Sequence, residues 1–159
     1  MTPGPGGALA ESPEERRRRW DLRFLDLARL VARWSKDPSR QVGAAVVRPD
    51  RSVASVGFNG FPAAMPDGAA LYADKAAKRS RIVHAEINAT LFAREPVRGY
   101  TLYTWPYLSC DRCAAQLLQA GIARFVAPRP PAGASPEGEA LRALARQYCA
   151  ECGAEVSEL

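Results

Sequence analysis

The sequence predicts a single-domain α/β fold whose layers pack around a mixed β-sheet. Three observations lead to this prediction. The chain has 159 residues, a length typical of one domain. Two apolar segments at 41–47 and 52–58 flank a turn at 48–51, as in a β-hairpin. Beyond the hairpin, strand-like segments alternate with helical ones, and that alternation favours a layered α/β architecture.

The first half of the chain is expected to supply one helix besides the hairpin. Residues 1–13 are rich in Gly, Pro and Ala without periodicity, so they are expected to form a disordered tail, which leaves 14–159 as the single domain. A helix starts at residue 14 and carries a broad apolar face up to Trp34. Residues 61–80 contain scattered Gly, Pro and Ala and are predicted to be a long irregular connection.

The second half is expected to contain three helices and three strands. The helix expected at 111–120 is followed by Gly121, and glycine is the residue that most commonly ends a helix in the left-handed conformation. The expected helices are 82–93, 111–120 and 137–149, and the expected strands are 99–104, 124–126 and 154–159.

Composition limits the classes of function. The formal net charge of +5 would suit an anionic ligand such as a nucleotide or nucleic acid. The same charge would also be found on a surface that is only solvated, so it does not decide between these possibilities. No apolar run approaches the roughly 20 residues that span a bilayer, and the N-terminus lacks a signal-peptide core, so no membrane partner and a cytoplasmic location are expected. The four cysteines are then expected to be metal ligands or free thiols rather than disulfides.

A combination of ligand-type residues lies between the expected helices. His84 is the only histidine, Glu86 follows two residues later, and Cys110 and Cys113 share a face at the start of the 111–120 helix. One imidazole and two thiolates match the three protein ligands of a catalytic zinc with an open fourth position. Glu86 is then better suited to acid–base chemistry than to ligation. The N-terminus of a helix carries partial positive charge, which would lower the pKa of cysteine thiols there and favour the metal-binding thiolates.

These motifs carry a family resemblance. H-A-E at 84–86 followed by C-x-x-C at 110–113 resembles the signature of the zinc-dependent nucleoside and nucleotide deaminases. S-K-D-P at 35–38 and G-F-N-G-F-P at 57–62 are similar to the deoxycytidylate (dCMP) deaminase branch, and the resemblance covers roughly residues 20–128. It implies a three-layer α/β/α cytidine-deaminase-like fold with a mixed five-stranded sheet.

The resemblance also implies an activity. The expected reaction is hydrolytic deamination of a pyrimidine nucleotide, foremost dCMP to dUMP and ammonia. His84, Cys110 and Cys113 would hold Zn²⁺, and Glu86 would take a proton from water and deliver protons to N3 of the base and to the departing amine. A small-molecule nucleotide is the expected substrate, and a homo-oligomer, plausibly a hexamer, the expected assembly.

Five further residues are expected to contact the substrate. Lys36 is assigned to the phosphate, Asn59 to the sugar or phosphate, and Phe61 to the substrate loop, while the backbone N–H of Ala85 would donate to the base carbonyl and Tyr107 would lie against the base. Other basic residues form either an anion-attracting rim or a solvated turn just before the metal motif: Lys75, Lys78, Arg79 and Arg81.

Other interpretations remain open. The enzyme could act on another cytosine or adenine derivative, or on a base in tRNA or single-stranded DNA, which the four arginines at 16–19 keep in view. A catalytically silent zinc module is the third possibility, although structural zinc has no need of Glu86. Cys149 and Cys152 could be half a structural zinc site, a redox pair or, as we expect, free thiols. Ser109 replaces the family's proline and is expected to cap the next helix.

Overall fold

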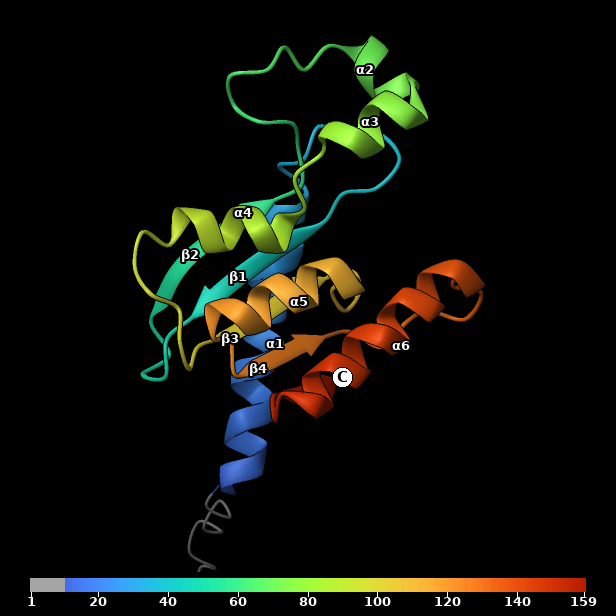
Figure 1. Ribbon diagram of the computed structural model, residues 1–159. Coiled ribbons are helices and arrows are strands. Elements are labelled where there is room, and N and C mark those ends of the chain that lie inside the picture. The colour runs from blue at the N-terminus through green and yellow to red at the C-terminus, as the bar shows by residue number, and fades with distance from the viewer. Residues whose placement is uncertain (1–10) are drawn as a thin grey trace, which may run out of the picture.

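The computed structural model describes residues 11–159, which form three layers (Figure 1). The middle layer is one sheet of five strands in the order β2-β1-β3-β4-β5. β1 pairs antiparallel with β2 and β3, whereas β4 pairs parallel with β3 and β5, so the sheet is mixed as predicted. The strands are β1 Gly43–Val47, β2 Val53–Phe58, β3 Thr101–Trp105, β4 Arg124–Ala127 and β5 Glu155–Glu158.

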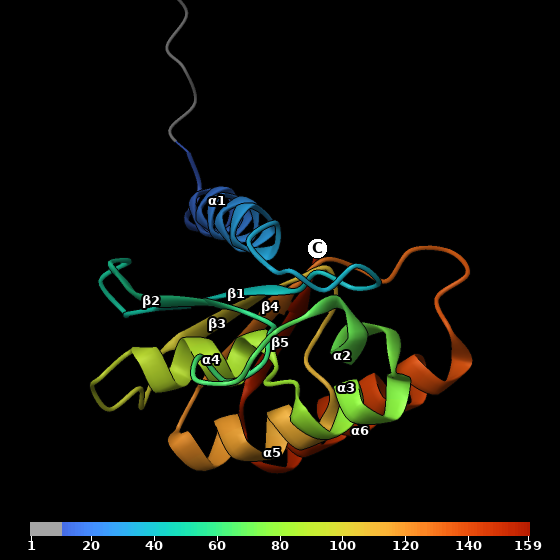
Figure 2. The ribbon, with the colours of Figure 1, turned by 90° about the horizontal axis from the view of Figure 1, so that it is seen from above.

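Helices cover both faces of the sheet, which confirms the predicted three-layer α/β/α fold. Figure 2 shows α1 alone on one face and α4, α5 and α6 on the other. Each face has its own apolar cluster, and the larger one lies beneath α4, α5 and α6. The helices are α1 Pro13–Ala32, α2 Ala69–Ala73, α3 Lys75–Arg81, α4 Ala85–Phe92, α5 Asp111–Ala120 and α6 Pro136–Glu151.

The start of α1 is set by a capping box. The Ser12 hydroxyl accepts a hydrogen bond from the backbone N–H of Glu15 at 3.1 Å. The Glu15 carboxylate accepts one from the backbone N–H of Ser12 at 2.7 Å. Pro13 is therefore already helical, whereas the sequence placed it in the tail. The rest of that expected tail, residues 1–10, lies outside the described residues. None of the helices in 11–159 is both long and apolar enough to cross a membrane.

The expected irregular connection at 61–80 is wrong in its second half, which forms α2 and α3. Asp74 explains the second of these helices, because its carboxylate accepts from the backbone N–H of Ala76 at 2.9 Å and of Ala77 at 3.0 Å. The start of the first metal-motif helix was also predicted three residues too early. Val83 forms a backbone bridge with Gly60, so the chain is extended there and the helix begins at Ala85.

Two glycines let helices approach the sheet closely. A Cβ on Gly43 would lie 2.1 Å from the carbonyl oxygen of Ala28 in α1. A Cβ on Gly57 would lie 2.3 Å from the backbone nitrogen of Ala89 in α4. Neither distance is possible for a real side chain, so these positions fix how near α1 and α4 sit to the strands. The spacing of α4 matters most, because α4 carries the metal motif.

Candidate metal centre and adjoining cavity

The start of α4 and the start of α5 bring three ligand atoms together. His84 is the N-cap residue of α4, Cys110 is the N-cap residue of α5, and Cys113 lies in the first turn of α5. His84 Nδ1 is 3.2 Å from Cys113 Sγ and 3.7 Å from Cys110 Sγ, and all three ligand atoms lie within 4.8 Å of one another. Ligands of one tetrahedral zinc are separated by about 3.5–3.8 Å, so the cluster fits that ion.

The electrostatics of the cluster favour a metal-binding thiolate. A hydrogen bond from the Cys113 thiol lowers the pKa of Cys110 to about 4, against the effect of burial, and His84 and the backbone N–H of Cys113 contribute in the same direction. Cys110 is therefore ionised at neutral pH. The hydrogen bond with Cys110 in turn raises the pKa of His84. The hydrogen bond between the two cysteines, together with burial, raises the pKa of Cys113, so without a metal the two thiols share one proton and Cys110 carries the negative charge.

Glu86 lies beside this cluster in the first turn of α4. It is only 4% exposed, and its burial raises the pKa of the carboxyl group, an effect that the neighbouring His84 partly opposes. A buried carboxylate with a raised pKa is a better proton acceptor than an exposed one. Glu86 also lines the adjoining cavity, so the carboxylate can meet a ligand there.

The expectation that Ser109 caps α5 is wrong. The helix begins one residue later than that role requires, and Cys110 is the N-cap residue, with no side-chain capping hydrogen bond. The Ser109 side chain is buried, and its hydroxyl makes no hydrogen bond within residues 11–159. Gly121 does end α5 in the left-handed conformation, with φ of 94°, as predicted.

A cavity of about 890 Å³ adjoins the cluster. It is lined by the 37–42 loop, by α3, by the segment between β3 and α5, and by the start of α6. Three of the expected substrate residues, Asn59, Ala85 and Tyr107, lie on its surface. Two do not. Lys36 Nζ is 2.6 Å from Asp67 Oδ2, and the Phe61 ring packs against Tyr72 with 4.6 Å between ring centroids.

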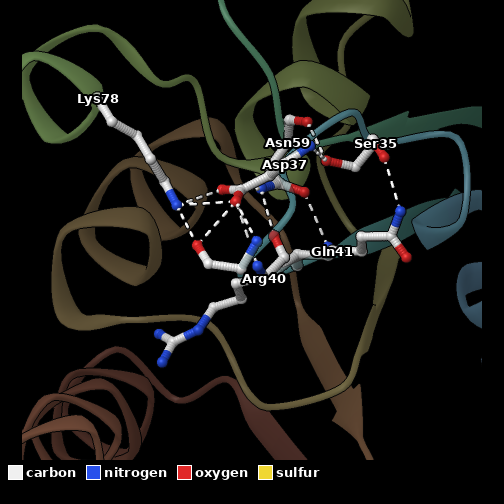
Figure 3. Close-up of polar contacts among 8 residues, drawn as sticks. Ser35, Asp37, Arg40, Gln41, Asn59 and Lys78 are labelled. Carbon is white, nitrogen blue, oxygen red and sulfur yellow. Dashed lines mark hydrogen bonds and ion pairs between the residues drawn. The ribbon is translucent and has the colours of Figure 1, made fainter. Parts of the chain in front are cut away.

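Asn59 is engaged in holding the loop that precedes β1 (Figure 3). Its Oδ1 accepts a hydrogen bond from the backbone N–H of Val42 at 2.8 Å, and its Nδ2 donates one to the backbone carbonyl of Arg40 at 2.8 Å. The same network contains Asp37, which forms an ion pair with Lys78 of α3 at 2.7 Å. The Asp37 side chain is 1% exposed and that of Lys78 is 16% exposed. The loop and α3 are therefore joined across one side of the cavity.

Several charged residues of the cavity were given no role by the sequence, and Arg142 is the most buried of the arginines among them. Arg142, in the middle of α6, is only 7% exposed and lies on the cavity surface. Within a helix that alternates apolar and charged residues, an arginine resembles any surface cation, so the sequence offers no local signal for it. Cys149 and Cys152, at the end of the same helix, form no disulfide. Neither lines the cavity.

Comparison with known proteins identifies the family. Residues 18–128 match the family model described as the cytidine and deoxycytidylate deaminase zinc-binding region. The chain belongs to this family. The matched region contains the His84–Cys110–Cys113 cluster, so the cofactor is Zn²⁺, as the sequence predicted.

Individual relatives agree with the family. The chain is 41% identical over 110 residues to an uncharacterized deaminase from the luxG 3′ region of Aliivibrio fischeri, covering 69% of this chain and 73% of that protein. It is 31% identical over 131 residues to the deoxycytidylate deaminase of Homo sapiens, covering 79% and 73%. It spans a smaller share, 65%, of the probable deoxycytidylate deaminase of Drosophila melanogaster, with 34% identity over 74% of this chain.

Solved structures support the fold. The dCMP deaminase of the cyanophage S-TIM5 superposes with a TM-score of 0.66 and 22% identity, over 93% of this chain and 99% of that one. The structure of the same phage protein in complex with dCMP and dUMP gives a TM-score of 0.65 and 20% identity. These similarities confirm the cytidine-deaminase-like fold predicted from the sequence.

Proposed function

We propose that this chain is a zinc-dependent hydrolase that converts dCMP to dUMP and ammonia. One observation carries the proposal: a His–Cys–Cys cluster with a buried glutamate opens onto a cavity lined by cations. The substrate is inferred from the relatives, several of which are named deoxycytidylate deaminases. The cavity volume of about 890 Å³ is within the usual range for small-molecule sites, roughly 300–1,000 Å³.

The chemistry follows from the residues at the cluster. His84, Cys110 and Cys113 would hold the zinc. Bound zinc of this kind lowers the pKa of a water ligand from 15.7 towards about 7. Glu86 would accept a proton from the attacking water, because its carboxyl is buried beside the cluster and its pKa is raised. It would pass this proton to N3 of cytosine as the water oxygen bonds to C4. It would then take the remaining hydroxyl proton and give it to the amine, which leaves as the C4 carbonyl forms.

The walls of the cavity orient the base. The backbone N–H of Ala85 lies at the start of α4, where the first amides of a helix lack internal partners, so it is available to the carbonyl of cytosine. Tyr107 presents an aromatic ring to the cavity from the segment between β3 and α5. An aromatic side chain at this place would stack on a planar base and exclude water from the reacting carbon.

A substrate panel tests the proposal. The zinc-loaded protein is incubated with dCMP, CMP, deoxycytidine and a cytosine-containing oligonucleotide, and the ultraviolet change from cytosine to uracil is followed. We expect dCMP to have the highest kcat/KM. A protein that turns over the oligonucleotide faster than dCMP would contradict the nucleotide assignment, and a protein inactive on all four compounds would contradict the enzyme.

We also propose that the chain forms a homo-oligomer and acts in the cytoplasm. Leu91 and Phe92, at the end of α4, are 66% and 59% exposed, and Leu30 and Trp34, at the end of α1, are both 50% exposed. Exposed apolar side chains of this size are typical of contact surfaces between proteins. Light scattering after gel filtration tests the assembly. A purely monomeric parent protein at micromolar concentration would exclude it.

A further inference from the structure

A smaller cavity of about 160 Å³ adjoins the main one. It lies between the 131–135 loop, the start of α6 and two arginines, Arg40 and Arg142. Tyr107 and both arginines line the small and the large cavity alike, so the two are continuous. The loop and Arg142 lie beyond residues 18–128, the region that the family model matches. Arg40 and Tyr107 lie inside that region, so the side pocket combines residues from within and beyond the match.

The guanidinium of Arg142 is held in place by two contacts. Its Nε donates to Glu139 Oε2 at 3.0 Å, and its Cζ lies 5.0 Å from the centroid of the Tyr107 ring. A Cβ on Gly138 would be 3.1 Å from Arg142 Nη1, tighter than an ordinary contact. A glycine at this helical position costs stability, and here it leaves room for the guanidinium. The side chain is thus preorganised, although it is an arginine of high intrinsic flexibility.

Much of the hydrogen-bonding capacity of this guanidinium is unused. Nη2 is buried and 3.0 Å from Glu139 Oε2, yet it makes no hydrogen bond of acceptable geometry within residues 11–159. Glu139 is itself shared, because Arg146 Nη1 lies 2.7 Å from its other carboxylate oxygen. A buried guanidinium with unsatisfied N–H groups is costly unless a ligand completes it.

Arg40 supplies the second cation. Its backbone carbonyl is held by Asn59, but Figure 3 shows its guanidinium projecting away from that hydrogen-bonded network. The residue is exposed and lines both cavities. An arginine fork matches the oxygens of a phosphate, and two forks on one pocket suit a dianion. The acidic residue Glu137 also lines the main cavity but not the side pocket.

We infer that Arg40 and Arg142 bind the 5′-phosphate of the substrate nucleotide in this side pocket. The inference rests on the proposed function and names the residues that select a monophosphate over a nucleoside. It replaces Lys36, which the sequence favoured for the phosphate and which pairs with Asp67 outside the cavity. The base lies at the zinc cluster, and the phosphate lies between Tyr107 and α6.

The test compares a nucleotide with its nucleoside. In Arg142→Gln and in Arg40→Gln, the ratio of kcat/KM for dCMP to that for deoxycytidine should fall roughly 10- to 100-fold, as for the loss of a hydrogen bond to a charged group. Arg142→Lys should restore part of the ratio. Arg33→Gln is the control, since Arg33 is an exposed arginine at the end of α1 that lines neither cavity, and its ratio should equal that of the parent.

Binding of the product separates this inference from the proposed activity. Calorimetry on the zinc-loaded protein should show dUMP binding more tightly than deoxyuridine in the parent, and this difference should shrink in both arginine variants. If the parent deaminates dCMP while Arg142→Gln and Arg40→Gln keep the full nucleotide preference, the side pocket is not the phosphate site and the deaminase stands. Loss of that preference in Lys36→Gln instead would also overturn the inference.

A folding defect is recognised independently. Arg142 is buried, so its variants are accepted only if their thermal midpoints and zinc contents match those of the parent protein. Gly138→Ala gives a second approach, because its new methyl group displaces Nη1 without removing any charge. We expect this variant to lose nucleotide preference while retaining deoxycytidine turnover. Unchanged preference in Gly138→Ala and in Arg40→Gln together would refute the assignment.

Discussion

Replacing Gly57 by alanine should disturb the metal centre without touching a metal ligand or Glu86. Gly57 is buried in β2, and its backbone is of a kind that alanine adopts freely, so the only cost is steric. The new Cβ would lie 2.3 Å from the nitrogen and 2.8 Å from the Cα of Ala89, and 2.6 Å from the carbonyl oxygen of Ala85. All three atoms belong to the backbone of α4, which carries Glu86 and follows His84.

The magnitude follows from these distances. The closest atom is about 1 Å nearer than an ordinary contact, and a helix backbone cannot yield as a flexible side chain can. Overpacking typically costs about 1–3 kcal/mol, and we expect the upper part of that range here. At about 2–4 °C per kcal/mol for a chain of this size, the thermal midpoint should fall by about 5–10 °C. A shift of α4 by about 1 Å would also misalign Glu86, which can lower turnover by about 100-fold.

Thermal denaturation and kcat on dCMP measure the two effects. Gly60→Ala is the control, because Gly60 lies just beyond the same strand and a Cβ there would meet nothing within 4 Å. The control should keep the parent's midpoint and turnover. If Gly57→Ala were as stable and as active as Gly60→Ala, the close approach of β2 to α4 would not position the site.

Three further predictions concern individual side chains. Cys110→Ala should lose zinc and activity while Cys149→Ala keeps about one zinc per chain, measured by elemental analysis, and the opposite pattern would mean that the wrong cysteine was assigned. Glu86→Gln should retain zinc and fold but lose turnover by about 10²–10⁴-fold, so near-normal kcat would exclude its proton transfer. Lys78→Gln should lower stability at pH 7 by up to about 3 kcal/mol, because it leaves buried Asp37 unpaired. Burial opposes ionisation of Asp37, yet the hydrogen bond from Lys78 helps hold its pKa below 3.8, so this stabilisation is present above that value and is lost as the pH falls further. Urea denaturation of parent and variant at pH 7 and below pH 4 should therefore show a difference that shrinks with acidification, and a constant difference would contradict the pairing.

Local patterns accounted for most of the fold. The bounds of α5 were predicted correctly, because its apolar face is followed at once by a helix-ending glycine. The hairpin was also recognised, since its turn separates two apolar segments. One error comes from a contact distant in sequence and another from a local signal. The extended backbone at Val83 depends on its bridge to Gly60, which no helical periodicity reveals. The Asp74 cap of α3 was a local signal that went unused.

The metal cluster could be predicted because short motifs determine it. Two residues separate the cysteines, and one residue separates His84 from Glu86, so each pair is placed by a single helix start. The substrate contacts could not be predicted in this way. Lys36 and Arg40 are close in the same basic loop, but Lys36 turns to Asp67 and only Arg40 lines the cavity. Which of two neighbouring cations faces a ligand depends on partners far along the chain.

The residues expected to carry out the reaction and those proposed to select the substrate lie in different parts of the chain. Glu86 and the three residues of the metal cluster all lie between His84 and Cys113, within the region that the family model matches. The side pocket combines Arg40, from the loop before β1, with Arg142, from a helix outside that region. Residues of α6 make no contribution to the metal cluster. Substitutions in α6 can therefore change the preference for a nucleotide over its nucleoside while the reaction at the base is retained. A family match can therefore specify the chemistry of this chain without specifying its substrate, and α6 is where the substrate has to be determined.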